Sequence, residues 1–155
     1  MVNRRLFLLL RLIPLFPAVL VLLAQAGHVT PFTGTWKLNV TKSEFHPGPP
    51  FKNFTITFTP DGTRHLNLIH ADGQQLTASL PWSDGKQVSV TGMENATATS
   101  RIEGRALHDI WKQNGKVIED VHGVVSPDGK TLRVTVDGTG KQGRSYHNEL
   151  IFERQ

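Results

Sequence analysis

The chain has 155 residues, with 17 Lys and Arg against 13 Asp and Glu, and it contains no cysteine. Three basic residues and no acidic ones fall within residues 1–26, so residues 27–155 are almost neutral, with 14 basic against 13 acidic side chains. This balance argues against recognition of nucleic acid or of acidic membranes, and the lack of cysteine excludes disulfides, a thiolate nucleophile and cysteine-based metal sites.

Residues 1–26 have the three-part layout of a secretory signal peptide. Two arginines precede a leucine-rich apolar run, and an Ala-Gln-Ala cleavage signature follows at 24–26. Arg11 interrupts the run, which disfavours an uncleaved anchor of about 20 apolar residues. We therefore expect a signal peptide at 1–26, one domain at 27–155, a secreted or periplasmic location, and no membrane contact after cleavage.

The rest of the chain has the pattern of an antiparallel meander. Asp-Gly, Glu-Gly and Asn-Gly turn pairs recur along it, and between them apolar residues alternate with polar ones, as at Phe54, Ile56 and Phe58. The runs predict ten strands, near residues 34–40, 52–59, 63–70, 75–82, 86–91, 96–102, 106–113, 116–125, 130–137 and 144–153. If the last strand pairs with the first, no edge stays open. The predicted fold is all-β, an up-and-down barrel of about ten strands.

Turn residues predict how the strands are paired. A Pro-Asp-Gly turn at 127–129, like its counterpart earlier in the chain, suits a three-residue loop with glycine in the left-handed position. Other Asp-Gly loops, taken the same way, pair Leu68 with Leu76 and Leu80 with Val88. These registers place the apolar residues of successive strands on one face.

The two ends of the predicted barrel carry a family resemblance. Gly34-Thr35-Trp36 opens the first strand, and an aromatic-Glu-basic sequence ending at Arg154 closes the last. This resembles the lipocalins and the intracellular fatty-acid-binding proteins, whose first strand carries Gly-x-Trp. The resemblance implies a lipocalin-like barrel with Trp36 at its closed end. We expect Gly34, Trp36 and Arg154 to form this structural floor, with the guanidinium over the indole.

Most of residues 27–155 is similar to small exported bacterial proteins with a lipocalin-like domain. They share Gly-Thr-Trp-Lys-Leu-Asn at 34–39, Pro-Gly-Pro at 47–49 and Asp-Gly-Lys-Thr at 128–131. The similarity implies a fold and a location but no activity. Fatty-acid-binding proteins bind the ligand carboxylate with an Arg-x-Tyr pair in the last strand, where this chain has Leu-Ile-Phe at 150–152. Their helical lid also has no counterpart in the short, proline-rich connection at 43–52.

The strands at 106–113 and 116–125 contain the candidate site residues. A two-residue turn at 114–115 would place Asp109 opposite Asp120, with Trp111 and His122 on the same inward face. Two facing carboxylates repel unless a proton or cation lies between them. Asp109, Trp111, Asp120 and His122 are therefore candidates for orienting a ligand. The alternatives are solvated positions at the barrel mouth, or a three-residue loop that turns Asp109 outward.

Arg144 and Tyr146 form a second candidate site. They share parity with Leu150 and Phe152 in the last strand, which predicts that they point inward. Their spacing repeats the Arg-x-Tyr pattern nearer the start of the strand, as a displaced anion clamp would. The alternative is a pair on the surface rim.

Other signs of chemistry are weak. The seven histidines show no clustered spacing, so we predict no metal site. The sequence contains no serine nucleophile elbow and no phosphate loop, so we predict no cofactor and no catalysis. The leading hypothesis is an exported, monomeric protein that binds a small, mainly apolar ligand. A solid barrel that inhibits or scaffolds another protein is the alternative, and a haem- or metal-dependent barrel enzyme is the third hypothesis.

Overall fold

The computed structural model describes residues 30–48, 51–140 and 143–155, so the predicted signal peptide lies outside the described residues. The strands within them are β1 (Gly34–Leu38), β2 (Glu44–His46), β3 (Asn53–Phe58), β4 (Thr63–Ile69), β5 (Gln75–Pro81), β6 (Gln87–Ser89), β7 (Ala96–Glu103), β8 (Ala106–Gln113), β9 (Lys116–Val125), β10 (Thr131–Thr139) and β11 (Ser145–Arg154). One 3-10 helix, η1 (Val40–Lys42), joins β1 to β2. No helix in these ranges has the length and hydropathy that a membrane crossing requires.

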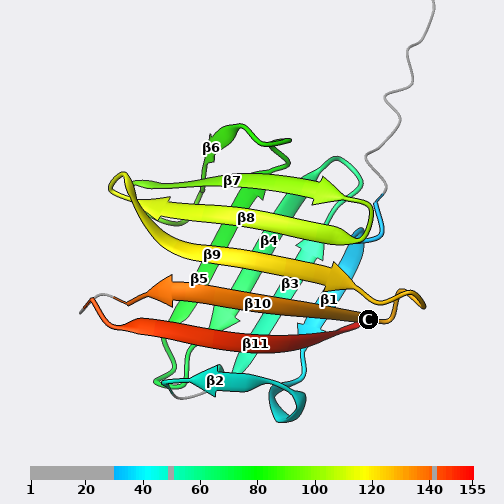
Figure 1. The fold of residues 1–155 in the computed structure, drawn as a ribbon, viewed down its shortest axis with the longest axis horizontal. Coiled ribbons are helices and arrows are strands. Elements are labelled where there is room, and N and C mark those ends of the chain that lie inside the picture. The colour runs from blue at the N-terminus through cyan, green and yellow to red at the C-terminus, as the bar shows by residue number, and fades with distance from the viewer. Residues whose placement is uncertain (1–29, 49–50, 141–142) are drawn as a thin grey trace, which may run out of the picture.

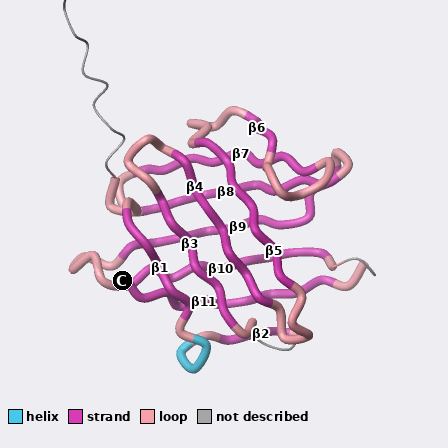
Figure 2. The backbone as a smooth tube through the Cα atoms, turned by 180° about the vertical axis from the view of Figure 1, so that it is seen from behind, coloured by secondary structure: helices cyan, strands magenta, loops and turns pink. Residues whose placement is uncertain are grey.

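The strands form a nearly closed antiparallel barrel. The strand order is β5-β4-β3-β1-β11-β10-β9-β8-β7-β6, so the last strand pairs with the first as predicted, and Trp36 lies opposite Arg154. Figure 1 shows β7 to β11 as a front layer that crosses β1, β3, β4 and β5, and Figure 2 shows that second layer from behind. The sheet ends meet at one bridge, where Ser79 and Thr91 exchange backbone hydrogen bonds of 2.8 and 2.9 Å.

The alternating pattern in the sequence produces the core. Side chains on the inner face are almost fully buried, among them Trp36, Ile56, Ala78, Leu80, Ala98, Trp111, Leu132, Val134, Leu150 and Phe152. Phe32 joins them from the segment before β1 and packs 5.5 Å from Phe58, measured between ring centroids. Each large apolar side chain buried in this way stabilises the fold by about 1.5–3 kcal/mol.

Two details of the pairing differ from the prediction, and the first lies at the seam where β5 meets the segment after β6. Leu68 pairs with Leu76 as expected, but the pairing of Leu80 with Val88 is wrong. The segment after β5 turns away, and β6 pairs with β7 instead, which leaves the seam to the single bridge. The unpredicted strand β2 is three residues long and pairs with β11. Such a short strand has too few alternating residues to be found by pattern.

The β8–β9 hairpin contains a bulge that the sequence pattern did not indicate. Its turn at 114–115 has two residues with positive φ, 50° and 76°, as predicted. A bulge between Trp111 and Lys112 then shifts the register, so Asp109 lies opposite Val121 and not opposite Asp120.

A second shift follows at the other end of β9. The loop predicted to have three residues at 127–129 has four, since the Ser126 amide donates to the Thr131 carbonyl. Between the two shifts β9 is turned over relative to the prediction, because a slip of one residue moves every side chain to the opposite face.

Candidate ligand-binding cavity

The closed end of the barrel brings together Gly34, Trp36 and Arg154. The Arg154 guanidinium carbon lies 4.1 Å from the Trp36 ring centroid, and its nitrogens donate to the carbonyls of Pro31, Thr33 and Gly129 at 2.5–2.6 Å. Gly34 has φ of +125°, and a Cβ atom there would lie 2.8 Å from an Arg154 nitrogen.

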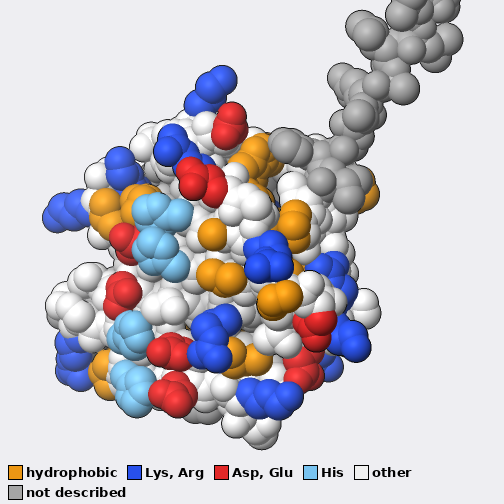
Figure 3. Space-filling model, turned by 45° about the vertical axis from the view of Figure 1, so that its right-hand side comes forward, with side chains coloured by type: hydrophobic (Ala, Val, Ile, Leu, Met, Phe, Trp, Pro, Cys, Tyr) orange, Lys and Arg blue, Asp and Glu red, His pale blue; other side chains and the backbone are white. Residues whose placement is uncertain are grey.

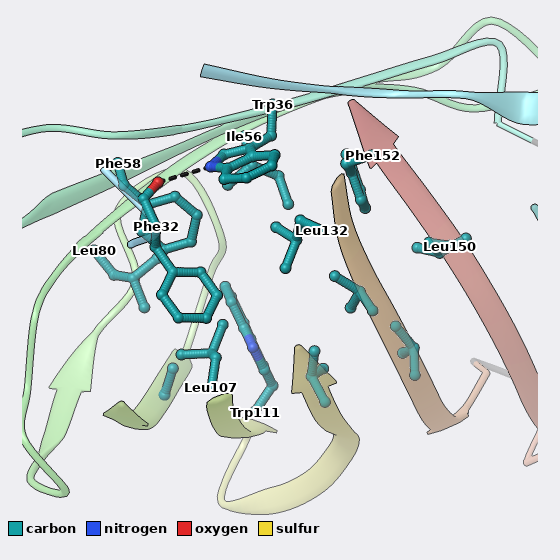
Figure 4. Close-up of a cluster of buried hydrophobic side chains, with 14 of the residues drawn as sticks. Phe32, Trp36, Ile56, Phe58, Leu80, Leu107, Trp111, Leu132, Leu150 and Phe152 are labelled. Atoms are coloured by element: carbon teal, nitrogen blue, oxygen red, sulfur yellow. Dashed lines mark hydrogen bonds between the residues drawn. The ribbon is translucent and has the colours of Figure 1, made fainter. Parts of the chain in front are cut away.

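The indole of Trp36 is also anchored at this floor. Its nitrogen donates to the Phe32 carbonyl at 2.7 Å, as Figure 4 shows. The buried indole and the hydrogen-bonded guanidinium together pack this end of the barrel.

The space toward the opposite end is a cavity of about 390 Å³. Most of its lining is apolar and comes from both layers of the barrel, including Phe54, Leu66, Leu68, Val134 and Leu150. Phe51 lies near its rim and contacts the rings of Phe45, Phe54 and His70 edge-on, at centroid distances of 5.7–5.8 Å. The polar residues that reach the cavity are Arg64, His70, Asp109, Glu119, Tyr146 and Asn148.

Arg64 and Asp109 form a buried ion pair in the cavity wall. The Arg64 Nη1 atom lies 2.5 Å from Asp109 Oδ2, and its Nη2 atom donates to the Ser100 hydroxyl at 3.2 Å. Their side chains are 9% and 1% exposed. The guanidinium also lies 5.6 and 5.7 Å from the ring centroids of Phe58 and Trp111.

One atom of this pair is left without a partner. Asp109 Oδ1 is buried and finds no hydrogen-bond donor among the described residues. A buried acceptor without a donor is unfavourable, so Asp109, which lines the cavity, keeps one unsatisfied oxygen.

Glu119 and Tyr146 form a second polar pair at the cavity. The bulge turns Glu119 inward, where it is half-buried and accepts a hydrogen bond from the Tyr146 hydroxyl. Burial raises the pKa of Glu119; this bond opposes the rise and the Asp109 charge adds to it. Burial also raises the pKa of Tyr146, with a contribution from Glu119, so its phenol remains a donor. Gly138 permits the pair, because a Cβ there would collide with the Tyr146 ring.

The structure separates the candidate residues predicted from sequence. Asp109 and Trp111 line the cavity, whereas the inward placement of Asp120 and His122 is wrong. The bulge turns both to the outer face, where His122 stacks on His108.

Arg144 and Tyr146 are also separated. Tyr146 lines the cavity, but Arg144 is exposed in the loop before β11 and is not among the described residues that line it. The inward placement of Arg144 is therefore wrong, because the parity of β11 does not extend into that loop.

Two residues of the cavity, Arg64 and Glu119, were not among the candidates predicted from sequence. Arg64 has the parity of Leu66 and Leu68 on β4, so strict alternation would have predicted that it faces inward. Glu119 carried no comparable signal, since only the register shift in the β8–β9 hairpin places it inside.

These features define the architectural class as a nearly closed antiparallel β-barrel of about ten strands with an internal cavity. Among solved structures, the fluorescent protein UnaG matches with a TM-score of 0.51 and 13% identity, over 80% of this chain and 97% of that chain. Zebrafish ileal bile acid-binding protein, crystallised with cholic acid, matches with a TM-score of 0.49 and 12% identity, over 81% of this chain and 100% of that chain. No protein-family model and no curated protein matches the sequence. The likeness to UnaG shows the fold alone.

Proposed function

We propose that this barrel is a binding module that holds one small, mainly apolar molecule and performs no catalytic step. The cavity supports this best, because its volume of about 390 Å³ falls within the range of roughly 300–1,000 Å³ that is typical of small-molecule sites. A mainly apolar cavity with a few polar groups can bury most of such a ligand and fix its orientation.

The polar groups favour a ligand that carries a hydrogen-bond donor. Arg64 is neutralised by Asp109, while Asp109 Oδ1 has no donor and Glu119 adds a second acidic group. A hydroxyl or N–H group would satisfy the free acceptor. A carboxylate at this position would set its oxygens against the unpaired Asp109 oxygen and near Glu119, while Arg64 is already paired, so the proposed ligand is not a fatty-acid anion.

The alternative of a solid protein-interaction barrel has less support. A barrel filled by its own side chains would lack this cavity, and an interaction surface would be expected to show an apolar patch. The large apolar side chains that are exposed in the described ranges are Val117 and Val124, at 56% and 52%. Two valines on β9 do not make such a patch.

The proposal includes export as a monomer. Its support is the arginine-flanked apolar run of residues 1–26 and the Ala-Gln-Ala sequence that follows it. Expression of the whole chain in a bacterial host, with mass spectrometry of the exported product, should give an N-terminus at Gly27. A product that keeps the leader would contradict export with cleavage.

Ligand binding can be tested with two dyes that differ in one group. N-phenyl-1-naphthylamine is apolar with a single N–H donor, and 1-anilinonaphthalene-8-sulfonate adds an anionic sulfonate. We expect one equivalent of the neutral dye to bind and the anionic dye to bind more than about tenfold more weakly. Native mass spectrometry of the gently purified protein should also detect any co-purified apolar compound.

A matched pair of substitutions locates the dye. Leu66→Trp fills the cavity and should abolish binding, whereas Val124→Trp adds the same ring to the outer face and should leave binding unchanged. Thermal unfolding of both variants verifies that they fold. Equal dye binding by folded Leu66→Trp would refute the proposed cavity site.

A further inference from the structure

Two histidines and an aspartate form a cluster on the outer wall of the barrel, away from the cavity. The bulge in the β8–β9 hairpin turns His122 and Asp120 outward, and β8 presents His108 directly opposite His122. Figure 3 shows histidine and acidic side chains gathered on one face of the molecule. Residues that look scattered along the chain are therefore adjacent in space.

The two imidazoles converge on one carboxylate oxygen of Asp120. Asp120 Oδ1 lies 2.8 Å from His108 Nε2 and 3.2 Å from His122 Nε2. The two imidazole rings stack with centroids 4.3 Å apart and planes 8° apart. One potential ligand atom from each residue lies within 4.8 Å of the others, and no other group of three in the described ranges does so.

This spacing is close to that of a metal site. Zinc holds nitrogen and oxygen ligands at about 2.0–2.2 Å in tetrahedral geometry, which sets the ligand atoms roughly 3.3 Å apart. The carboxylate–imidazole distances already approach that value, and rotation of the two exposed imidazoles out of their stacked planes would direct both nitrogen lone pairs at one ion. The side chains are 45–56% exposed, so an ion can enter directly from water.

Both imidazoles face the same oxygen of Asp120, so one carboxylate oxygen is the shared partner of two rings. Asp137 of β10 lies opposite Asp120 in the register and pairs with His147 Nδ1 at 2.7 Å, so it adds a second carboxylate to this face. One divalent ion would compensate the charge of Asp120 and use the free electron pairs of both rings.

We propose that His108, Asp120 and His122 bind a divalent transition metal of the zinc class on the outer wall of the barrel. Two imidazoles with one carboxylate select such ions over calcium and magnesium, which prefer oxygen ligands. Three protein ligands leave a fourth position for water. The site is independent of the cavity, so each can exist without the other.

The test is calorimetric titration of the untagged protein with zinc sulfate, with calcium chloride as the control ion. We expect one zinc ion per chain and no saturable binding of calcium. His108→Gln, His122→Gln and Asp120→Asn should each weaken zinc binding by more than about tenfold. His65→Gln is the matched control, since it removes another exposed strand histidine, on β4, and should leave affinity unchanged.

Zinc should also raise the thermal midpoint of the wild-type protein and of His65→Gln, but not that of His108→Gln, because only the folded state assembles the site. Far-UV circular dichroism verifies that the variants fold. Absence of stoichiometric zinc binding by the wild-type protein would overturn the proposal. An equal loss of affinity in His65→Gln and His108→Gln would also overturn it, since that result indicates diffuse binding to surface histidines.

Discussion

The two ends of this barrel are built from the same alternating strands, but one end is filled by side chains and the other contains the cavity. At the floor, Trp36 and Phe152 have no exposed surface, and the Arg154 guanidinium donates to three carbonyls. Beyond it, the walls leave about 390 Å³ empty and one buried carboxylate oxygen without a donor.

This difference shows where stability and binding are separated. Close packing and paired polar groups stabilise a fold, whereas empty volume and an unpaired acceptor lower its stability. The floor therefore holds the barrel together, and the cavity retains unfavourable features that a bound molecule would relieve. Substitutions at the two ends should have different consequences.

The largest effect is expected at the floor. Trp36→Ala removes a fully buried indole together with its hydrogen bond to Phe32, which should lower the free energy of unfolding by about 3–5 kcal/mol. Denaturant unfolding measures this loss. Under native conditions the variant should still bind the neutral dye. Lost dye affinity with unchanged stability would contradict the division between floor and cavity.

The buried pair in the cavity wall should come next. Arg64→Met leaves the Asp109 carboxylate buried without its cation, and this should cost about 3 kcal/mol of folding free energy. The double variant Arg64→Met/Asp109→Leu removes both charges and should be close to wild type in stability.

Dye binding distinguishes the two roles of that pair. The double variant should lose the preference for the neutral dye over its sulfonate analogue, because the repelling carboxylate is gone. If that preference persists, Asp109 does not determine which ligand the cavity accepts.

A smaller effect is expected from the backbone of the floor. Gly34→Ala introduces a Cβ at φ of +125° and 2.8 Å from an Arg154 nitrogen that is held by a hydrogen bond, which should cost about 1–3 kcal/mol. Gly104→Ala is the control, since it has φ of +59° and no atom within 4 Å of the new Cβ. Thermal unfolding should show the larger loss of stability for Gly34→Ala. Equal losses would mean that the Arg154 side chain moves aside at little cost.

The smallest effect concerns a pair on the solvent-exposed wall. The hydrogen bond that His147 Nδ1 donates to Asp137 Oδ1 at 2.7 Å raises the pKa of His147, with added attraction from Asp137 and Glu149. Because the folded-state pKa is raised, the stabilisation is fully present below the unfolded value of about 6.5 and is lost as pH rises through the folded-state value.

Asp137→Asn tests this pair. NMR titration should show a lower pKa for His147 in the variant than in the wild-type protein. An unchanged pKa would mean that solvent screens the interaction completely, in contrast to the buried pair of Arg64 and Asp109.

The sequence by itself determined the ten main strands, the pairing of the last strand with the first, and the residues of the floor. Alternation and turn chemistry are local properties, and Gly34, Trp36 and Arg154 lie at strand ends where pairing is tightly constrained. The inward position of Arg64 was also readable from its parity on β4.

Only the tertiary structure decided what faces the cavity. One bulge after Trp111 and one extra loop residue before Thr131 turn β9 over, which brings Glu119 inside and places Asp120 and His122 outside. Registers depend on pairing between strands, and a slip of one residue exchanges their faces without changing the local pattern. The cavity and the partner of Asp109 likewise arise from strands distant in sequence, so no local pattern contains them.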